Sequence, residues 1–179
     1  MIFTETHLKD AYIIDLKKIE DDRGFFARAY CQKEFAEHGI ELDWAQANLA
    51  NSKKRGTLRG LHYQKAPYAE AKLMRCIRGA IYDVIVDLRP DSPSYMQWLG
   101  VELTADNRRA LFIPEGFAHG YLVLEDDSDT FYPTSQFYTP GAEAGVRWND
   151  PAFGIEWPFT DGLIITEKDQ SWPDYEPVE

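Results

Sequence analysis

The chain has 179 residues, of which 44% are hydrophobic and 14% are aromatic. This composition is sufficient for one sizeable core, and no change in composition divides the chain, so we expect a single domain over residues 1–179. The formal net charge of −11 argues against binding to nucleic acid or to an anionic membrane surface, since both require a basic surface. An anionic ligand would therefore need a local cluster of basic side chains.

The N-terminal stretch MIFTETHLKDAY lacks the basic region and apolar core of a secretory signal. No apolar run approaches the roughly 18 to 20 residues that span a bilayer. We therefore expect a cytoplasmic protein without a membrane segment. Cys31 and Cys76 are too few for a disulfide framework, and we expect both to be reduced, buried thiols.

Strand signals dominate the chain in sequence order. Short segments rich in β-branched and aromatic residues predict strands at residues 11–16, 24–30, 57–64, 71–79, 81–89, 97–103, 109–115 and 120–126. One helix is predicted over residues 31–39, with Phe35 on its apolar side and Gly39 as its stop. From about residue 150 the sequence predicts an extended, proline-braced tail over the body. The pattern is typical of an all-β sandwich or double-sheet jelly roll that binds ligands in its mouth.

The strand predicted at residues 81–89 alternates in an informative way. Ile81, Asp83, Ile85 and Asp87 fall on one face, and the apolar Tyr82, Val84, Val86 and Leu88 fall on the other face. A carboxylate among the apolar residues of the first face predicts a polar cavity as well as a core.

The segment IPEGFAH, residues 113–119, has the P-x-G-x-x-H spacing of the second motif of cupin jelly rolls. Metal-binding cupins add two histidines two residues apart and a glutamate, so that alternate strand residues point at one ion. Here the pair is His62 and Gln64, and a carboxamide is a poor replacement for an imidazole. His62, Glu70 and His119 would form an incomplete set, so we expect a cupin-type barrel with no metal.

The polar residues that alternate inward are then His62, Lys72, Asp83, His119 and Tyr132. A histidine in a barrel mouth can accept a proton when a carboxylate fixes its tautomer and stabilises its cation. The same spacing also fits a structural histidine in the core. Lys72, at the start of its strand, fits a surface charge equally well.

Arginines supply the local basic cluster that an anionic ligand would need. Arg23, Arg59, Arg75 and Arg78 lie close to the candidate segments, and guanidinium forks suit phosphate oxygens, so a diphosphate site is indicated. Arg59 precedes His62 by three residues, which places the two side chains on opposite faces of a regular strand. A bulge at Gly60 or a site shared with another subunit would be needed to bring them together.

Several stretches together resemble one family, the dTDP-4-dehydrorhamnose 3,5-epimerases. The similar segments, in order, are DDRGFF (21–26), QAN (46–48), GTLRGLHYQ (56–64), AKLMRCIRGAIYDVIVDLRPDSPSY (71–95), IPEGFAHGY (113–121), WNDP (148–151) with IEWP (155–158), and EKD (167–169). The resemblance implies a metal-free cupin jelly roll that needs no cofactor. It also implies a homodimer in which the N-terminal region of one subunit contributes to the site of the other subunit.

The resemblance further implies residue roles in the epimerisation of a nucleotide-diphospho-4-keto-6-deoxyhexose for rhamnose-type deoxysugar biosynthesis. His62 is the base beside the sugar ketone, with Asp169 as its carboxylate partner. Lys72 stabilises the enolate oxygen at C4, and Tyr132 is the acid on the opposite face. The implied substrate-binding residues are Arg23, Phe26, Arg28, Gln46, Asn48, Arg59, His119, Tyr138 and Lys168.

Two residues depart from the pattern of many family members: Arg28 replaces a glutamate and Pro133 replaces a lysine. Because a guanidinium only donates hydrogen bonds, an Arg28 that reaches the base would relax the thymidine preference. If Arg28 turns to solvent or phosphate, thymidine recognition rests on Gln46, Asn48 and aromatic packing. The alternatives are a mono-epimerase acting on a CDP- or GDP-linked 4-keto sugar, a non-catalytic sugar-nucleotide-binding cupin, and a metal-dependent cupin oxygenase, which Gln64 disfavours.

Overall fold

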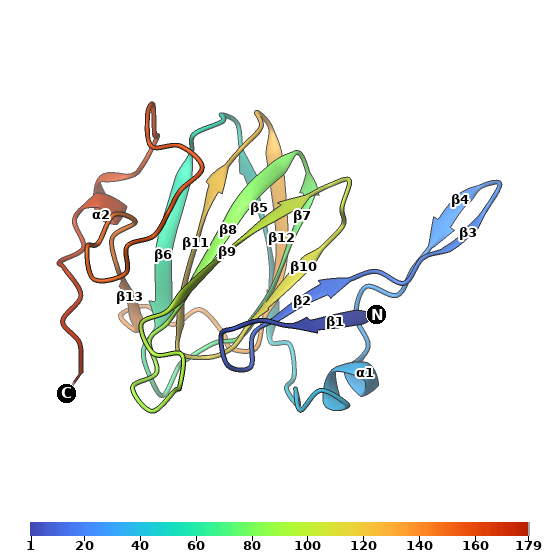
Figure 1. Cartoon of the computed structure of the whole chain (residues 1–179), viewed down its shortest axis with the longest axis horizontal. Coiled ribbons are helices and arrows are strands. Elements are labelled where there is room, and N and C mark those ends of the chain that lie inside the picture. The colour runs from blue at the N-terminus through green and yellow to red at the C-terminus, as the bar shows by residue number, and fades with distance from the viewer. Residues whose placement is uncertain (179) are drawn as a thin grey trace.

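Two antiparallel β-sheets face each other and hold the core between them (Figure 1). The computed structural model describes residues 1–178. One sheet has the strand order β1 (Ile2–Glu5), β2 (Tyr12–Asp15), β10 (Ala110–Ile113), β7 (Lys72–Arg78), β12 (Ser128–Thr134) and β5 (Gln46–Ser52). The other sheet has the order β13 (Glu143–Gly145), β6 (Leu58–Gln64), β11 (Phe117–Val123), β8 (Ala80–Asp87) and β9 (Trp98–Thr104). This arrangement confirms the predicted double-sheet jelly roll.

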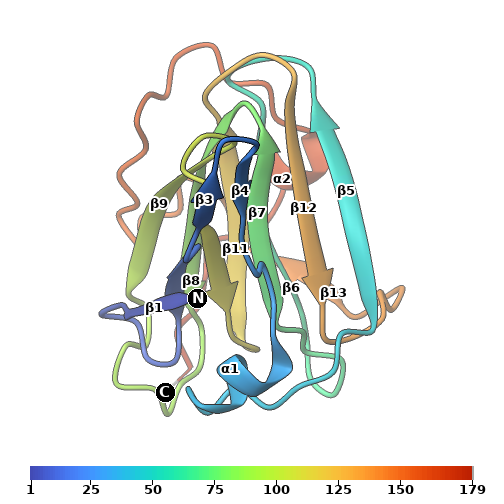
Figure 2. The same cartoon turned by 90° about the vertical axis from the view of Figure 1, so that its right-hand side faces the viewer.

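The remaining elements are short. Strands β3 (Ile19–Asp21) and β4 (Gly24–Phe26) form a separate hairpin that projects from the body (Figure 1). Helix α1 (Gln32–Ala36) lies at one end of the six-stranded sheet (Figure 2), and α2 (Glu167–Gln170) lies near the C-terminus. Among residues 1–178, no helix has the length and apolar character needed to cross a membrane.

Several boundaries differ from the sequence prediction. The predicted strand at 24–30 is limited to β4, the helix predicted over 31–39 ends at Ala36, and the strand predicted at 120–126 begins earlier, at Phe117. Phe35 is buried as expected, at 1% exposure. Both cysteines are free, but only Cys76 is buried; Cys31 is partly exposed, so the expectation of two buried thiols was wrong for Cys31.

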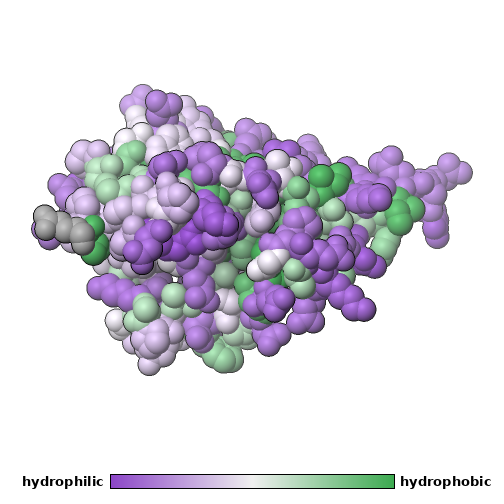
Figure 3. Space-filling view, turned by 60° about the horizontal axis from the view of Figure 1, so that its bottom comes forward, coloured by the Kyte–Doolittle hydropathy of each residue, from purple (hydrophilic) through white to green (hydrophobic). Residues whose placement is uncertain are grey.

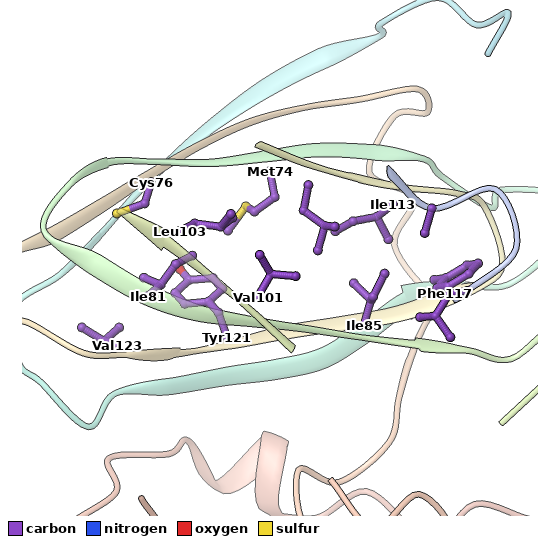
Figure 4. Packing of buried hydrophobic residues seen from close by; sticks show 13 residues of the cluster. Met74, Cys76, Ile81, Ile85, Val101, Leu103, Ile113, Phe117, Tyr121 and Val123 are labelled. Carbon is purple, nitrogen blue, oxygen red and sulfur yellow. The ribbon is translucent and has the colours of Figure 1, made fainter. Parts of the chain in front are cut away.

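The core between the sheets confirms the alternation predicted for β8. Ile81 and Ile85 face Met74 and Cys76 of β7 across the interior (Figure 4). Val84, on the opposite face of β8, packs in a second cluster against the C-terminal tail, which contributes Trp148, Phe153, Ile155, Trp157 and Tyr175. The tail is therefore extended over the outside of the five-stranded sheet, as the sequence predicts, and β8 is buried on both faces.

A bulge in β6 decides which of its side chains face the interior. His62 pairs with His119 of β11 and Arg59 pairs with Tyr121, so three residue steps on β6 match two steps on β11. The extra residue lies beside Gly60, whose φ is +110°. A Cβ at Gly60 would lie 2.6 Å from the Cα atom of Gly120, so both the backbone conformation and the close strand approach require glycine.

We therefore expect Gly60→Ala to destabilise the fold by about 3 kcal/mol or more, because it adds a backbone clash to the cost of a positive φ. Gly24→Ala is the matched control, since Gly24 has a φ of +123° and nothing within 4 Å of its Cβ position. The control should lose only about 1–2 kcal/mol, the cost of the backbone conformation. Urea unfolding of the three proteins measures both values. Equal losses in the two variants would show that the approach of β6 to β11 is not limiting.

Candidate active site

Two adjoining hollows are lined by residues of both sheets. One has a volume of about 250 Å³ and the other has a volume of about 320 Å³. His62, Lys72 and Tyr132 line both hollows. Three of the four predicted catalytic residues therefore lie at the junction, and the fourth, Asp169, lines the larger hollow.

His62 and Asp169 form a close pair. Nε2 of His62 lies 2.6 Å from Oδ1 of Asp169. The Asp169 side chain is only 5% exposed, whereas the His62 side chain is 32% exposed. The carboxylate therefore occupies one ring nitrogen and leaves Nδ1 for a ligand, as the predicted base requires.

Asp169 is held by both the tail and the bulge. It belongs to the short helix α2, whose N-cap residue Thr166 accepts a hydrogen bond from the Asp169 backbone N–H through Oγ1 at 3.2 Å. The N–H of Gly60 donates to Oδ2 of Asp169 at 3.3 Å. The bulge that turns β6 therefore also helps to fix the carboxylate beside His62.

Lys72 and Tyr132 approach the junction from the six-stranded sheet, opposite His62. Lys72 is 7% exposed, and its Nζ lies 3.1 Å from Oε1 of Glu70. Burial raises the pKa of the Tyr132 phenol to about 12. The site thus places a buried ammonium and a neutral proton donor across from an imidazole.

A second histidine and aspartate pair lies in the five-stranded sheet. Nε2 of His119 is 2.7 Å from Oδ1 of Asp83. His119 lines the larger hollow, and Asp83 lies behind it with no exposed surface. Burial raises the pKa of Asp83, and the neighbouring His119 and Lys72 oppose this shift. The polar cavity predicted from Asp83 on β8 is therefore present.

Arg59 lies on the same side as His62 because of the bulge. It lines the larger hollow, where its Nε donates to Oγ of Ser52 at 3.2 Å and its guanidinium donates to the carbonyl of Asn51 at 3.2 Å. A bulge at Gly60, and not a second subunit, therefore brings Arg59 and His62 to the same hollow. Lys168 lines the same hollow and forms an ion pair with Glu143.

The smaller hollow contains the predicted binding residues Gln46, Asn48 and Tyr138. Asn48 is opposite Tyr132 in the pairing of β5 with β12. The Gln46 side chain donates to Asn48 Oδ1 at 3.2 Å and accepts the backbone N–H of Tyr138 at 3.1 Å. This network holds a 59% exposed tyrosine ring at the rim.

Within the described residues 1–178, three predicted binding residues do not line either hollow. Arg23 lies in the turn of the β3–β4 hairpin and bonds to Asp21 of the same hairpin. Phe26 is 71% exposed, and hydrophobic atoms are visible on the projection that the hairpin forms (Figure 3). Arg28 is paired with Glu34 of α1 at 2.8 Å. The fold of one chain does not bring these three residues to the junction.

Gln64 and a few unpredicted residues complete the walls. The Gln64 amide nitrogen donates to the carbonyls of Tyr68 and Phe137, and its oxygen accepts the N–H of Thr139, so the side chain anchors a loop. Among residues 1–178, no three His, Cys, Asp or Glu side chains are grouped so as to hold a metal ion. The lining residues that sequence reasoning did not assign to the site are Ala50, Tyr63, Gln64, Glu70, Gly120, Tyr121, Thr134, Glu143 and Thr166.

The fold and the arrangement of these side chains are those of a cupin-type protein with a site for proton transfer. A cupin-type jelly roll that sets a His–carboxylate pair against an ammonium and a neutral phenol, with a guanidinium nearby, suits proton transfer on an anionic substrate.

Comparison with known proteins identifies the family. The family described as dTDP-4-dehydrorhamnose 3,5-epimerase matches residues 5–176. The dTDP-4-dehydrorhamnose 3,5-epimerase of Escherichia coli (strain K12) is 46% identical over 167 residues, covering 92% of this chain and 89% of that protein. The chain belongs to the dTDP-4-dehydrorhamnose 3,5-epimerase family, an isomerase family, which confirms the resemblance noted in the sequence.

Solved structures agree with this assignment. The crystal structure of dTDP-4-dehydrorhamnose 3,5-epimerase from Elizabethkingia anophelis NUHP1 has a TM-score of 0.95 and 40% identity, covering 98% of this chain and 96% of that chain. The dTDP-6-deoxy-D-glucose-3,5-epimerase from Legionella pneumophila Philadelphia 1, in complex with dTDP-4-keto-L-rhamnose, has a TM-score of 0.88 and 34% identity, covering 98% of each chain.

Proposed function

We propose that the chain inverts C3 and C5 of dTDP-4-dehydro-6-deoxyglucose in rhamnose-type deoxysugar biosynthesis. The observation that carries the proposal is the placement of His62 and Tyr132 on opposite sheets at one junction, with Lys72 beside them. A sugar ring between the sheets would meet a base on one face and an acid on the other. Family membership supplies the class of substrate.

In the proposed reaction, Nδ1 of His62 accepts the proton on the carbon next to the C4 ketone, and Asp169 stabilises the imidazolium that forms. The electron pair of the broken C–H bond moves into an enolate, whose C4 oxygen is stabilised by Lys72. Tyr132 then donates its phenolic proton to the other face of the same carbon. Its pKa, raised to about 12, keeps the phenol protonated at neutral pH, so that the proton is present when the enolate forms. The 4-keto group acidifies both C3–H and C5–H, so one base can serve both carbons if the ring adjusts.

Substrate contacts are proposed along both hollows. Arg59, Lys168 and His119 line the larger hollow and would hold anionic and polar groups, whereas Gln46, Asn48 and Tyr138 line the smaller hollow. Since Arg28 is engaged by Glu34 within the chain, we propose that thymidine recognition rests on the smaller hollow. The two free thiols fit a reducing, cytoplasmic location.

We further propose a homodimer of single-domain subunits in which each β3–β4 hairpin completes the site of the other subunit. Arg23 and Phe26 are predicted binding residues, yet they lie on a hairpin that projects away from the body of its own chain (Figure 1). Exposed apolar side chains on the hairpin, Ile19 at 69% and Phe26 at 71%, suit burial against a second copy.

His62→Ala should fold normally and lose solvent exchange at both sugar carbons, because loss of a general base commonly lowers the rate by about 10² to 10⁴. The measurement is NMR detection of deuterium at C3 and C5 after incubation of dTDP-4-dehydro-6-deoxyglucose with the protein in D₂O. His7→Ala, which changes an exposed histidine bonded to the Trp98 carbonyl, is the control and should exchange normally. Full residual exchange at either carbon in His62→Ala would assign the base to another group.

Tyr132→Phe should separate proton removal from inversion. His62 remains, so deuterium should still enter at C3 and C5, but without the acid on the far face the proton returns to the side it left. The ratio of exchange to epimer formation, followed in the same NMR experiment, should therefore rise at least tenfold. An unchanged epimer yield would remove Tyr132 from the reaction.

Subunit sharing can be tested by complementation. Arg23→Ala and His62→Ala are each expected to be inactive as homodimers. A heterodimer, co-expressed with two tags and purified through both, should have about half of wild-type activity, because one of its two sites receives both changes and the other site receives neither. An inactive heterodimer would place each hairpin at its own subunit's site, and a monomer in sedimentation analysis would exclude sharing.

A further inference from the structure

The His119–Asp83 pair is more deeply buried than the His62–Asp169 pair, and the proposed reaction gives this burial no role. Asp83 has no exposed surface and His119 is 7% exposed, so both groups are withdrawn from bulk water. Oδ1 of Asp83 meets Nε2 of His119 at 2.7 Å. Among residues 1–178, Oδ2 of Asp83 has no hydrogen-bond partner although it is buried.

A buried carboxylate with one oxygen unpartnered is costly unless its charge is balanced nearby. Lys72 is close enough to influence Asp83, but its ammonium is already 3.1 Å from the Glu70 carboxylate. Asp169 is better supported, because its Oδ2 accepts the Gly60 N–H and its pair reaches solvent through His62. His119 is therefore the main group that can balance the charge of Asp83. Burial of the pair favours a state with one more proton than an ionised Asp83 beside a neutral His119.

The position of that proton matters for what His119 can do. With Nε2 directed at Asp83, Nδ1 is the ring nitrogen left for a ligand. A neutral imidazole that donates from Nε2 has only a lone pair at Nδ1, which repels an enolate oxygen. When the pair holds one more proton, Nδ1 of His119 carries a hydrogen. The second proton then lies between Nε2 and Asp83, and Nδ1 is an N–H donor whichever of these two groups holds it.

Building on the proposed function, we propose that Asp83 is a positioning residue that keeps a hydrogen on Nδ1 of His119, so that His119 donates to the C4 oxygen of the substrate alongside Lys72. The two histidine pairs of one cavity then have complementary states. His62 offers a lone pair and removes a proton from carbon, whereas His119 offers an N–H to the oxygen on which negative charge develops.

The surroundings of the pair contain charges of both signs. Opposite Asp83 in the strand pairing lies Tyr121, and opposite His119 lie His62 and Ile85. The other titratable groups that line the same hollow or interact with Asp83 and its neighbours are Arg59, Glu70, Lys72, Cys76, Tyr132, Lys168 and Asp169.

The protonation of His119 can be read directly by NMR. The chain has four histidines, so long-range ¹H–¹⁵N spectra of the ¹⁵N-labelled protein resolve each ring, and His119→Gln assigns the signal. At pH 8, Nδ1 of His119 should carry hydrogen in the wild-type protein. An unprotonated Nδ1 at pH 8 would overturn the proposal, and this result does not depend on activity or on the proposed substrate.

Asp83→Asn tests the cause, because it preserves the shape of the side chain and removes its charge. At pH 8 the pair in this variant should hold no additional proton. Where the amide oxygen faces Nε2, the single ring hydrogen stays on Nε2, and kcat for epimerisation should fall by about 10² with KM little changed, as for loss of one oxyanion donor; the same spectrum shows an amide N–H facing Nε2 as hydrogen retained on Nδ1. The deficit relative to wild type should shrink at pH 6, where His119 can take a proton from solvent. Asp87→Asn changes another fully buried aspartate of β8 and should leave the His119 signal unaltered.

A merely structural role for Asp83 would give a loss of activity that is the same at pH 6 and pH 8, and this result would overturn the proposal. If Asp83→Asn does not fold, as shown by its thermal melt, the wild-type spectrum still decides the matter. If the wild-type protein fails to epimerise the dTDP-linked 4-keto sugar while Nδ1 is protonated, the proposed function fails and the assigned state of the pair stands.

Discussion

The close approach of β6 to β11 at Gly60 and Gly120 is the constraint on which the site depends. A Cβ on Gly120 would lie 2.6 Å from the carbonyl oxygen of Arg59, so neither strand tolerates a side chain at the crossing. This contact accommodates the extra residue of β6, and the bulge turns Arg59 toward the hollow that His62 lines. The N–H of Gly60 then meets Asp169. One crossing therefore aligns the guanidinium of Arg59, the imidazole of His62 and the carboxylate of Asp169.

Sequence reasoning predicted the parts of the site that depend on strand alternation. His62, Lys72, Asp83 and His119 face the interior because each lies on a segment whose period of two is visible in the sequence. The relation of Arg59 to His62 could not be predicted, because an odd spacing permits either a bulge or a second subunit. That choice depends on a contact with Gly120, a residue 60 positions away in the chain, which no local pattern contains.

The sequence did not predict five strands, β1, β3, β5, β12 and β13, and for β5 and β12 the reason is the polar character of the cavity wall. β5 has the sequence QANLANS, in which residues that line the smaller hollow, Gln46 and Asn48, replace the apolar residues of an ordinary strand. β12 carries Pro133, which cannot donate to a ladder and argues against a strand. Because a ligand cavity needs polar side chains where a core would need apolar ones, the hydrophobic pattern is weak in these two strands, although β6, β7 and β11, which also line the hollows, keep a pattern that predicts them. Pairing with β7 and with each other stabilises β5 and β12 instead.

Charge balance inside the hollows indicates where an anionic substrate would bind. Lys72 of β7 is paired with Glu70, and Lys168 of α2 is paired with Glu143, so each of these ammonium groups already has one carboxylate partner. Arg59 bonds only to neutral oxygens of Ser52 and Asn51, and among residues 1–178 it has no carboxylate in ion-pair range. A guanidinium held in place by neutral acceptors keeps its charge available for phosphate. In a chain with a net charge of −11, this uncompensated guanidinium supports the proposed binding of a diphosphate in the larger hollow.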